Sequence, residues 1–257
     1  MPNPSMRRSD PLSVAGDIAV SEISALADLR ESRATRRKRE TRTKLLEAAL
    51  ALMAEKGMEG VAINEITEAA DVGFGSFYNH FESKEAIYAA LTAWVFEAFA
   101  DSLDRQVSHL EDPAEVIAVC TRHTLLRARR EPVWGRFLLR EGFSTMTVRK
   151  GLGQRLWRDV QKGVAAGRFL PDDPSMRFIA AGGTVMASLA AELRWGELQG
   201  REEENAPLQG LRREGMPARA AAAVLRILGL DGAEAAEIAS RPLPSEPGDD
   251  VVENSGA

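Results

Sequence analysis

Between residues 73 and 84, the sequence GFGSFYNHFESK concentrates hydroxyl, amide, imidazole and ammonium groups. The hydroxyls of Ser76 and Tyr78 can bond to phosphate oxygens, and Asn79 and His80 can donate hydrogen bonds to phosphates or to base edges. Two glycines would let the backbone approach another molecule closely, and a phenylalanine could pack on thymine methyl groups. This pattern indicates a DNA-contacting surface, with these candidate residues: Gly73, Phe74, Gly75, Ser76, Tyr78, Asn79, His80 and Lys84.

The same segment holds residues that a packed helix would also need. Phe77 and Phe81 lie four positions apart, so on a helix they share one face, and we expect them to be core residues. For His80 the alternative is a helix-end side chain satisfied by local hydrogen bonds. Lys84 would lie in the first turn of a helix, where the dipole disfavours a cation, so its position makes sense if a phosphate supplies the anion.

Helices must position this segment, because apolar residues upstream of it recur at helical spacing up to Gly57. The pattern predicts a helix over residues 36–56, then a short helix with Ile66 on its inner face. A three-residue turn at 71–73 leads into a second short helix. This order is a helix-turn-helix arrangement, and Asn64 on the exposed face of the first short helix is a further candidate DNA contact.

Basic residues crowd the start of this unit. Residues 33–44 contain seven Lys or Arg side chains against Glu40 alone, which gives the stretch a charge of +6. The simplest interpretation is the solvated face of a helix start. Beside a helix-turn-helix, phosphate neutralisation or a minor-groove arm is favoured, with Arg42 as a candidate DNA contact.

The remainder of the chain predicts helices and no β alternation of useful length, so the expected fold is all-α. Ser83 can cap one helix, and the pairs Asp112-Pro113 and Asp173-Pro174 are start signals for two others. The expected helices after residue 83 are 84–107, 113–130, 132–143, 148–166, 174–198, 217–228 and 233–240. A polar mobile loop is expected at 199–215.

Residues 56–91 resemble the DNA-binding end of the TetR family of bacterial transcriptional regulators. The landmarks that carry the resemblance are Gly57, Ile66, Ala70, Asp71, Val72, Gly73, Gly75, Phe77, Tyr78, His80, Phe81 and Lys84. The chain departs from the family at two helix starts. Gly73 stands where Ser or Thr is usual, and Ala62 stands where Thr is usual. Glycine is an acceptable cap and alanine a poor one.

The resemblance implies an N-terminal three-helix DNA-binding domain followed by a helical ligand-binding and dimerisation domain. It implies a homodimeric regulator, most often a repressor, that binds a pseudo-palindromic operator in double-stranded DNA and is released by a small molecule. The expected organisation is a disordered extension at 1–32, the helix-turn-helix domain at 33–83, the helical regulatory domain at 84–240 and a disordered tail at 241–257.

Large apolar residues are plentiful between about 84 and 200, more than a purely structural helical scaffold would need. An ordinary helical core is the alternative, whereas the resemblance implies a ligand cavity among these helices. The candidate ligand-binding residues are Trp94, His123, Trp134, Phe137, Arg140 and Trp157.

Small residues inside the helix from 174 suggest close contact with another helix. An interior glycine such as Gly182 costs about 1 kcal/mol of helix propensity, which close packing would offset. The resemblance implies that this helix and the Ala-rich helix at 217–228 form a four-helix interface between two chains, with intrachain packing as the alternative. The candidate interface residues are Gly182, Met186, Leu189, Leu193, Ala221 and Leu225.

Composition excludes several classes of protein. The 257 residues carry a net charge of -5 and a single cysteine, so neither a disulfide scaffold nor a multi-cysteine zinc site is expected, and no cofactor is implied. No uninterrupted apolar run reaches the roughly 18 residues of a membrane span, and the N-terminus lacks the features of a signal peptide. A soluble, cytoplasmic protein without a membrane partner is therefore expected.

Two other functions remain open at this point. Cys120 and His123 lie at i and i+3 on one helix and could serve an enzyme, although no oxyanion donors or orienting partner can be recognised. We therefore expect a buried structural cysteine. A helical ligand-binding or adaptor protein that has lost DNA binding is the second alternative.

Overall fold

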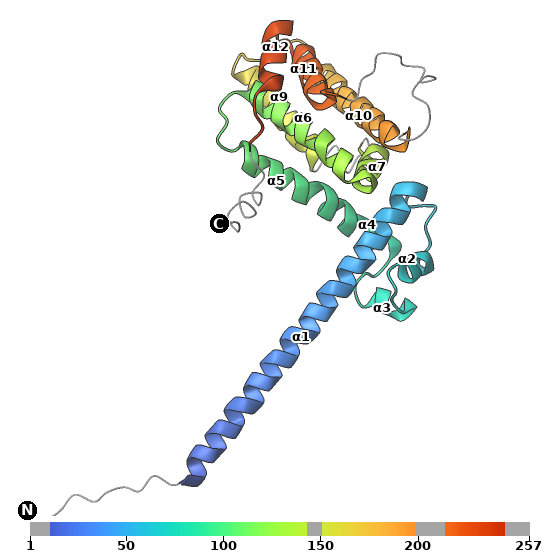
Figure 1. Cartoon of the computed structure of the whole chain (residues 1–257), viewed down its shortest axis with the longest axis vertical. Coiled ribbons are helices and arrows are strands. Elements are labelled where there is room, and N and C mark those ends of the chain that lie inside the picture. Colours follow the sequence, from blue (N-terminus) through green and yellow to red (C-terminus); the bar gives the residue numbers. More distant parts are fainter. Residues whose placement is uncertain (1–10, 143–150, 199–213, 245–257) are drawn as a thin grey trace, which may run out of the picture.

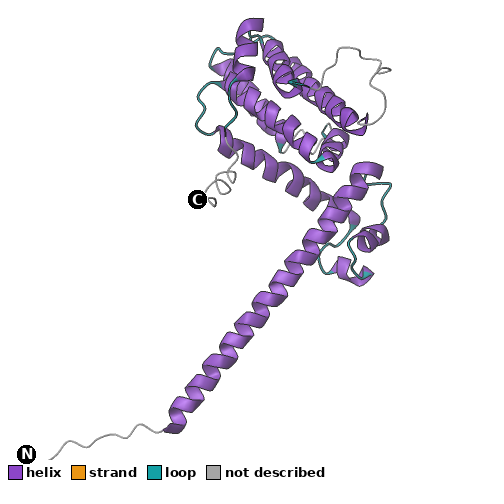
Figure 2. Ribbon diagram, in the orientation of Figure 1, coloured by secondary structure: helices purple, strands orange, loops and turns teal. Residues whose placement is uncertain are grey.

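Helices and their connecting loops make up the described part of the chain (Figure 2). The computed structural model describes residues 11–142, 151–198 and 214–244. No strand occurs in these ranges, which confirms the all-α fold class. The elements are α1 (Pro11–Lys56), α2 (Ile63–Ala69), α3 (Phe74–Tyr78), α4 (Lys84–Thr92), the π-helix η1 (Ala93–Glu97), α5 (Ala98–Val107), α6 (Pro113–Arg130), α7 (Pro132–Glu141), α9 (Leu152–Ala165), α10 (Pro174–Leu198), α11 (Met216–Leu228) and α12 (Gly232–Ser240).

The C-terminal half of α1 forms a small unit with α2 and α3. Leu45, Ile66 and Phe77, one from each helix, are fully buried in the same core. The chain can reverse after α1 because Gly57 adopts a φ of +75°, which a residue without a Cβ tolerates. The predicted end of the first helix and the helix-turn-helix order are confirmed.

The start of α1 differs from our expectation. We predicted disorder over residues 1–32 and a helix from about residue 36, whereas the structure continues α1 to Pro11. No proline follows Pro11, and no glycine follows Gly16, until Gly57, so nothing in the sequence interrupts a helix. Figure 1 shows the N-terminal half of α1 extending away from the rest of the molecule. Residues 1–10 lie outside the described residues.

A continuous helical rod leads from the N-terminal unit into the body, as α4, η1 and α5. Ser83 caps it, since its Oγ accepts a hydrogen bond from the Ala86 N–H at 3.2 Å. We predicted one regular helix over 84–107, and the structure inserts a π-helical turn at Ala93–Glu97. Such single π turns are often found at functional positions. Ile87, Leu91, Val95 and Phe99, each four positions after the last, are all buried and form the inner face of this rod.

The remaining helices pack into a bundle above this rod (Figure 1). Helix α6 begins and ends where predicted, and the Asp112 carboxylate accepts from the Ala114 N–H at 2.9 Å as its cap. Helix α9 begins at Leu152, after Gly151 with a φ of +67°, later than the predicted residue 148. Residues 143–150 and most of the predicted loop at 199–215 and tail at 241–257 lie outside the described residues.

Two helical stretches, Lys84–Val107 and Pro174–Arg194, are long and apolar enough to meet the length and composition of a membrane span. Each contributes to the interior of the bundle, with Leu91 and Leu189 fully buried. Core helices of soluble proteins meet the same criteria, so the two stretches are weak evidence for a span.

Candidate functional site

Helix α3 presents two large aromatic side chains to solvent while a third anchors it. Phe74 and Tyr78 are 54% and 52% exposed, and Phe77 between them is completely buried. The exposed pair is in edge contact, with ring centroids 5.7 Å apart. A five-residue helix held from beneath by one phenylalanine therefore displays the outward face that sequence reasoning predicted.

The rest of this face is open. Gly73, extended at φ -63° and ψ 143°, precedes the first turn, and a Cβ at Gly75 would meet no atom within 4 Å. Ser76 is half-buried and Asn79, which ends the helix, is exposed. No described side chain therefore blocks the approach of another molecule to the backbone at Gly75.

His80 lies where α3 meets α1. Its Nδ1 is buried and has no hydrogen-bond partner among the described residues. Burial lowers the pKa of His80, and the nearby charges of Lys38 and Arg42 on α1 lower it further. The Arg42 guanidinium also lies over the Phe81 ring, 5.1 Å from its centroid. The basic stretch of α1 thus adjoins the end of α3.

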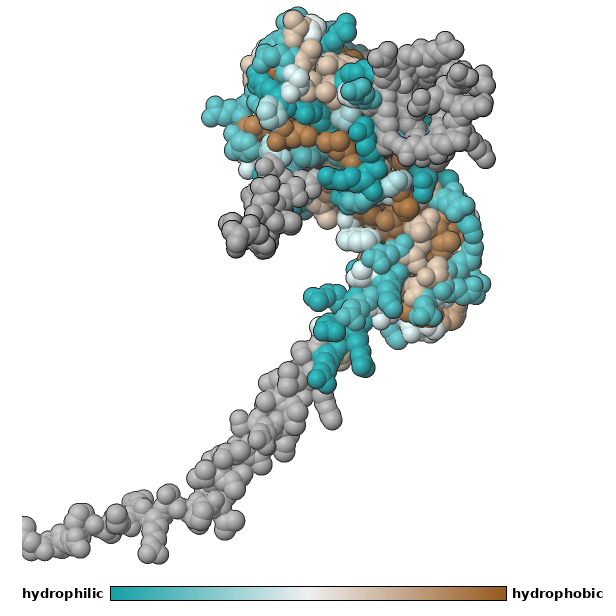
Figure 3. All heavy atoms as spheres, in the orientation of Figure 1, coloured by the Kyte–Doolittle hydropathy of each residue, from teal (hydrophilic) through white to brown (hydrophobic). Residues whose placement is uncertain are grey.

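The other predicted DNA contacts surround this face. Asn64 on α2 is exposed, and Lys84 is half-buried in the first turn of α4. The seven basic residues between 33 and 44 are all exposed, and Arg36 forms an ion pair with Glu40 at 3.0 Å. Figure 3 shows hydrophilic side chains projecting from this part of α1. The structure places all ten predicted residues in the N-terminal unit or at the start of α4.

The start of α2 compensates for its missing hydroxyl cap. The Ala62 N–H donates to the Glu65 carboxylate at 2.8 Å, and the Lys56 ammonium lies 2.5 Å from the same carboxylate group. That pairing lowers the pKa of Glu65, mainly through the hydrogen bond from Lys56. One free N–H of α2 is therefore satisfied without the usual threonine.

A cavity of about 720 Å³ lies inside the bundle, between α5, α6, the C-terminal end of α7, α9 and α10. Apolar side chains dominate its wall. Trp157 and Phe178 are in edge contact there, with centroids 5.5 Å apart. Thr121, Thr124 and Cys120 add small polar groups from α6. A largely apolar pocket with a few polar groups is typical of a small-molecule site.

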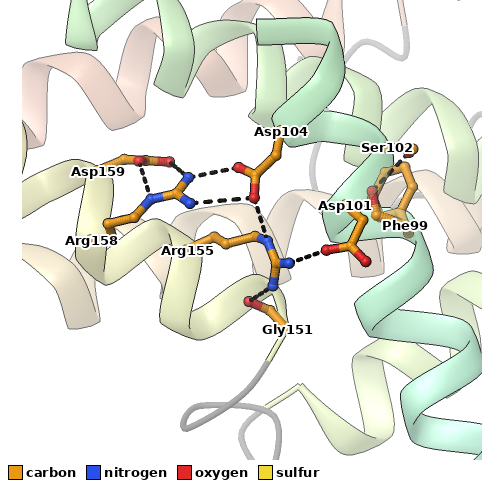
Figure 4. Close-up of polar contacts among 8 residues, drawn as sticks. All are labelled: Phe99, Asp101, Ser102, Asp104, Gly151, Arg155, Arg158 and Asp159. Atoms are coloured by element: carbon orange, nitrogen blue, oxygen red, sulfur yellow. Dashed lines mark hydrogen bonds and ion pairs between the residues drawn. The ribbon is translucent and has the colours of Figure 1, made fainter. Parts of the chain in front are cut away.

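Alternating carboxylates and guanidinium groups form a network beside this cavity (Figure 4), and Asp104, Arg155 and Asp159 of this network line it. Arg155 donates to Asp104 at 2.8 Å and also to Asp101. Arg158 bonds to Asp104 at 2.7 Å and to Asp159 at 2.8 Å. We call this group, Asp101, Asp104, Arg155, Arg158 and Asp159, the charged wall.

The charged wall separates two spaces. Asp104 and Asp159 line the main cavity and also a second cavity of about 500 Å³ beside it. Burial raises the pKa of Asp104, but the hydrogen bonds and charges of Arg158 and Arg155 outweigh burial and hold it below its usual value. The same carboxylates raise the pKa of Arg158. The ion pairs between Asp104 and Arg158 therefore favour the charged form of both side chains.

Sequence reasoning missed the charged wall. A signal was present, because Arg155, Arg158 and Asp159 share one face of α9, and Asp101 and Asp104 share one face of α5. The sequence does not show that these two faces meet, because α5 and α9 lie more than 50 positions apart.

Of the six predicted ligand-binding residues, only Trp157 lines the cavity. Trp134 and Phe137 are buried in the core between α7 and the rod, and Trp94 is 42% exposed. His123 is buried in α6 away from the cavity wall. Arg140 donates to the Glu55 carbonyl of α1 at 2.8 Å. The other five residues do not line this cavity, and aromatic residues at core spacing cannot be distinguished from cavity residues in sequence.

The cysteine and histidine of α6 do not form a catalytic pair around the cavity. Cys120 lines the cavity and His123 does not. Burial, with the negative charges of Asp159 and Asp104, raises the pKa of Cys120 to about 12. A thiol that stays protonated is a poor nucleophile, so this geometry does not favour the enzyme alternative.

The predicted dimer residues face inward. Leu189, Ala221 and Leu225 are fully buried within the single chain, and Leu193 is 8% exposed. Gly182 and Met186 line the cavity. The apolar stripe of α10 that the sequence suggested as an interface packs within the bundle of a single chain. Another stripe of α10 remains exposed, with Met176 57% accessible and Ala180 and Ala187 also exposed.

Comparison with known families covers both parts of the chain. Residues 45–91 match the family model described as bacterial regulatory proteins, tetR family. Residues 112–241 match the model described as tetracyclin repressor-like, C-terminal domain. The two matches correspond to the helix-turn-helix unit and to the bundle that holds the cavity.

Relatives with assigned functions are transcriptional regulators. The HTH-type transcriptional repressor KstR2 of Mycobacterium tuberculosis (strain ATCC 25618 / H37Rv) is 30% identical over 151 residues, which are 54% of this chain and 75% of the relative. The repressor DhaR of Mycobacterium sp. (strain GP1) is 37% identical over 103 residues, 40% of this chain and 50% of the relative.

Solved structures extend the likeness over most of the chain. RolR in complex with resorcinol is 34% identical, with a TM-score of 0.59, and the match covers 82% of this chain and 99% of RolR. FadR from Bacillus subtilis in complex with stearoyl-CoA, at 16% identity, has a TM-score of 0.56 over 74% of this chain and 98% of FadR, and shares the fold.

Proposed function

The chain belongs to the TetR family of bacterial regulatory proteins, and from this premise we propose that it represses transcription by binding operator DNA through α3 until a small molecule occupies the cavity. The exposed face of α3 is the observation that carries the proposal. Phe74 and Tyr78 point outward from a helix that the buried Phe77 anchors, an arrangement suited to entering a major groove.

Residues of α3 and its surroundings divide by role. Phe74 and Asn79 are placed to meet base edges, because they are exposed at the two ends of α3. Tyr78, His80 and Lys84 are suited to phosphates, which fix the register of the helix on the duplex. The charge of the basic stretch at residues 33–44 adds sequence-independent attraction to the DNA backbone.

The ligand that we propose is a small hydroxylated aromatic compound. The Trp157 and Phe178 rings can contact an aromatic face, while the charged wall offers carboxylate acceptors and guanidinium donors to hydroxyl groups. RolR, the relative whose crystal structure holds resorcinol, supports this chemical class. Asp104, Arg155 and Asp159 are the residues that we expect to orient the ligand.

Dimerisation is proposed on the outer stripe of α10. Met176, Ala180, Gly183 and Ala187 follow one another at spacings of three or four, and a Cβ at Gly183 would meet no atom within 4 Å of its own chain. Small residues at these positions permit two helices to approach closely. Helix α11 packs beside α10 and would complete a four-helix interface with a second copy.

A two-fold dimer dictates the shape of the operator. Two copies of α3 on one face of DNA require half-sites related by symmetry, about 34 to 36 Å apart or a multiple of that distance. The proposed operator is therefore a pseudo-palindrome, and the proposed location of the protein is the cytoplasm, where the chromosome lies.

DNA binding is tested by gel shift and footprinting on the DNA upstream of the protein's own gene. We expect a discrete complex and a protected, two-fold symmetric sequence, both lost when Tyr78, Asn79, His80 and Lys84 are replaced together by alanine. A folded wild-type protein that binds this DNA no better than an unrelated fragment would contradict the proposal. It would favour a ligand-binding protein without DNA binding.

A further inference from the structure

Helix α7 lies between the cavity and the N-terminal unit. It packs against α1 on one side and α10 on the other, and Figure 1 shows it beside the C-terminal end of α1. Leu138 and the residue that follows α7, Gly142, line the cavity. The last turn of this helix therefore contacts both the proposed ligand site and the DNA-binding part of the chain.

Two polar bonds join that last turn to the N-terminal unit and to the helix that follows it. The Arg140 guanidinium donates to the Glu55 carbonyl at 2.8 Å, and so satisfies one of the free carbonyls at the end of α1. The neighbouring Glu141 carboxylate accepts a hydrogen bond from the Tyr88 hydroxyl of α4. Arg140 and Glu141, adjacent in sequence, thus form hydrogen bonds with two different helices, α1 and α4.

The bond between Tyr88 and Glu141 is well sheltered. Tyr88 is partly buried, and its ring is in edge contact with Phe137 of α7 at a centroid distance of 6.5 Å. Burial, with the hydrogen bond to Glu141 and its charge, raises the pKa of Tyr88. The phenol therefore stays protonated and remains a donor over the physiological pH range.

On the cavity side, the contact between α7 and α10 is tight. A Cβ added to Gly142 would lie 2.6 Å from Cε and 3.1 Å from Sδ of Met186, a residue of the cavity wall. It would also lie 2.7 Å from the Leu138 carbonyl oxygen. A ligand that displaces the Met186 side chain towards Gly142 has little free space to push into, so it must move the last turn of α7.

We propose that the last turn of α7 transmits ligand binding to the DNA-binding unit, through the Arg140–Glu55 and Tyr88–Glu141 hydrogen bonds. This inference rests on the proposed function and names the positioning residues within it. Movement of the turn shifts the end of α1 and the middle of α4 together. Helix α1 packs against both α4 and α2, and α2 packs against α3, so the position of α3 on DNA changes.

The first test measures operator affinity with and without resorcinol as the probe. The double variant Tyr88→Phe/Arg140→Ala removes both bonds, and Arg136→Ala on the same helix is the matched control, because no bond from Arg136 to the N-terminal unit is seen in the described residues. We expect the double variant to bind resorcinol within about twofold of the wild type by calorimetry. The loss of operator affinity caused by resorcinol, an effect of about 5 to 150-fold in ordinary switches, should shrink at least threefold.

In this test, an unchanged resorcinol effect in the double variant would overturn the inference, as would an equal reduction in Arg136→Ala. The gel shift of the wild type on its upstream DNA shows whether operator binding fails, and calorimetry shows whether resorcinol binding fails. A wild type that binds no operator leaves nothing to couple and overturns both proposals. A wild type that binds operator but not resorcinol contradicts the ligand class alone.

The second test needs no ligand. Gly142→Leu crowds Met186 and should displace the last turn of α7, weakening operator binding at least threefold in the wild-type background. The same substitution in the Tyr88→Phe/Arg140→Ala background should have a smaller effect. An equal effect in both backgrounds, or none in either, would contradict the inference. Circular dichroism and thermal melting verify folding, and Gly142→Ala replaces the leucine variant if that variant does not fold.

Discussion

Arg155 of α9 donates a hydrogen bond from Nε to the Asp104 carboxylate of α5 at 2.8 Å, across 51 positions of sequence. This bond joins two walls of the cavity. Arg158 reaches the same carboxylate from one turn further along α9, so Asp104 is the point where both guanidinium groups meet (Figure 4). A ligand hydroxyl that enters the charged wall must share these partners, which makes Asp104 the most sensitive position of the cavity.

Replacing Asp104 with asparagine should weaken binding of resorcinol at least tenfold. The amide keeps the shape of the side chain but loses the charge that positions Arg155 and Arg158, and hydrogen bonds to charged groups are about twice as strong as neutral ones. Calorimetry with resorcinol measures the change. Glu47→Gln, at an exposed carboxylate on α1, is the control for loss of one negative charge. Equal affinities in wild type and Asp104→Asn would remove the charged wall from the ligand site.

Two substitutions on different faces of α10 should affect different properties, one the dimer and the other ligand binding. Ala187→Glu places a charge on the exposed stripe and should convert the dimer to monomers at micromolar concentration. Gly182→Leu fills part of the cavity and should leave the dimer intact while weakening ligand binding. Sedimentation velocity measures the first effect and calorimetry the second. A dimer that withstands Ala187→Glu but dissociates in Gly182→Leu would restore the inward stripe as the interface.

Lys84→Ala should weaken binding to all DNA sequences by a similar factor. If its ammonium neutralises one phosphate, the slope of log K against log salt should become shallower by about 0.9. Asn79→Ala should instead change which operator variants are preferred, since its amide can reach base edges. Fluorescence anisotropy at several salt concentrations distinguishes the two. An unchanged salt slope in Lys84→Ala would place its side chain off the DNA backbone.

Operator affinity should rise as the pH falls from 7.5 to 5.5, and His80 should account for the change. Burial and the charges of Lys38 and Arg42 lower the pKa of His80 in the free protein, so its imidazole is neutral at pH 7. A phosphate beside it would raise the pKa. A group with a higher pKa in the complex takes up a proton on binding, so acid favours the complex. We expect an increase of about threefold or more for one such group.

The contribution of His80 to the stability of the free protein has the opposite pH dependence. The lowered pKa of His80 means that the folded state binds fewer protons than the unfolded state, so the contribution to stability is present above the usual pKa and falls as the pH falls through it. His80→Gln should flatten both pH dependences. A pH profile of operator binding that is identical in wild type and His80→Gln would show that His80 does not contact phosphate.

Local signals made part of this structure predictable. Helix α6 begins at Pro113 because Asp112 supplies the cap and proline suits the first position, and both facts are visible in the sequence. The buried Phe77 between two exposed aromatic residues follows from helical periodicity over five residues. The order and the approximate ends of the helices in the DNA-binding unit could be predicted because local residues such as Gly57 and Ser83 mark them.

The cavity could not be predicted in the same way. Its polar wall joins α5 to α9, more than 50 positions apart, and no local pattern specifies which charges will meet. Helix α10 has small and apolar residues on two faces, so periodicity alone could not tell the stripe packed within the chain from the exposed one. Trp134 and Trp157 look alike in sequence, yet one fills the core and the other lines the cavity.

One anisotropy titration tests whether occupancy of the cavity controls DNA binding. Labelled DNA from upstream of the gene is titrated with the protein, with and without saturating resorcinol, and Asp104→Asn is titrated in parallel. We expect operator binding that resorcinol weakens about 5 to 150-fold in the wild type, and a much smaller effect at the same resorcinol concentration in the variant. Identical wild-type curves with and without resorcinol, for a protein that calorimetry shows to be loaded, would contradict this expectation.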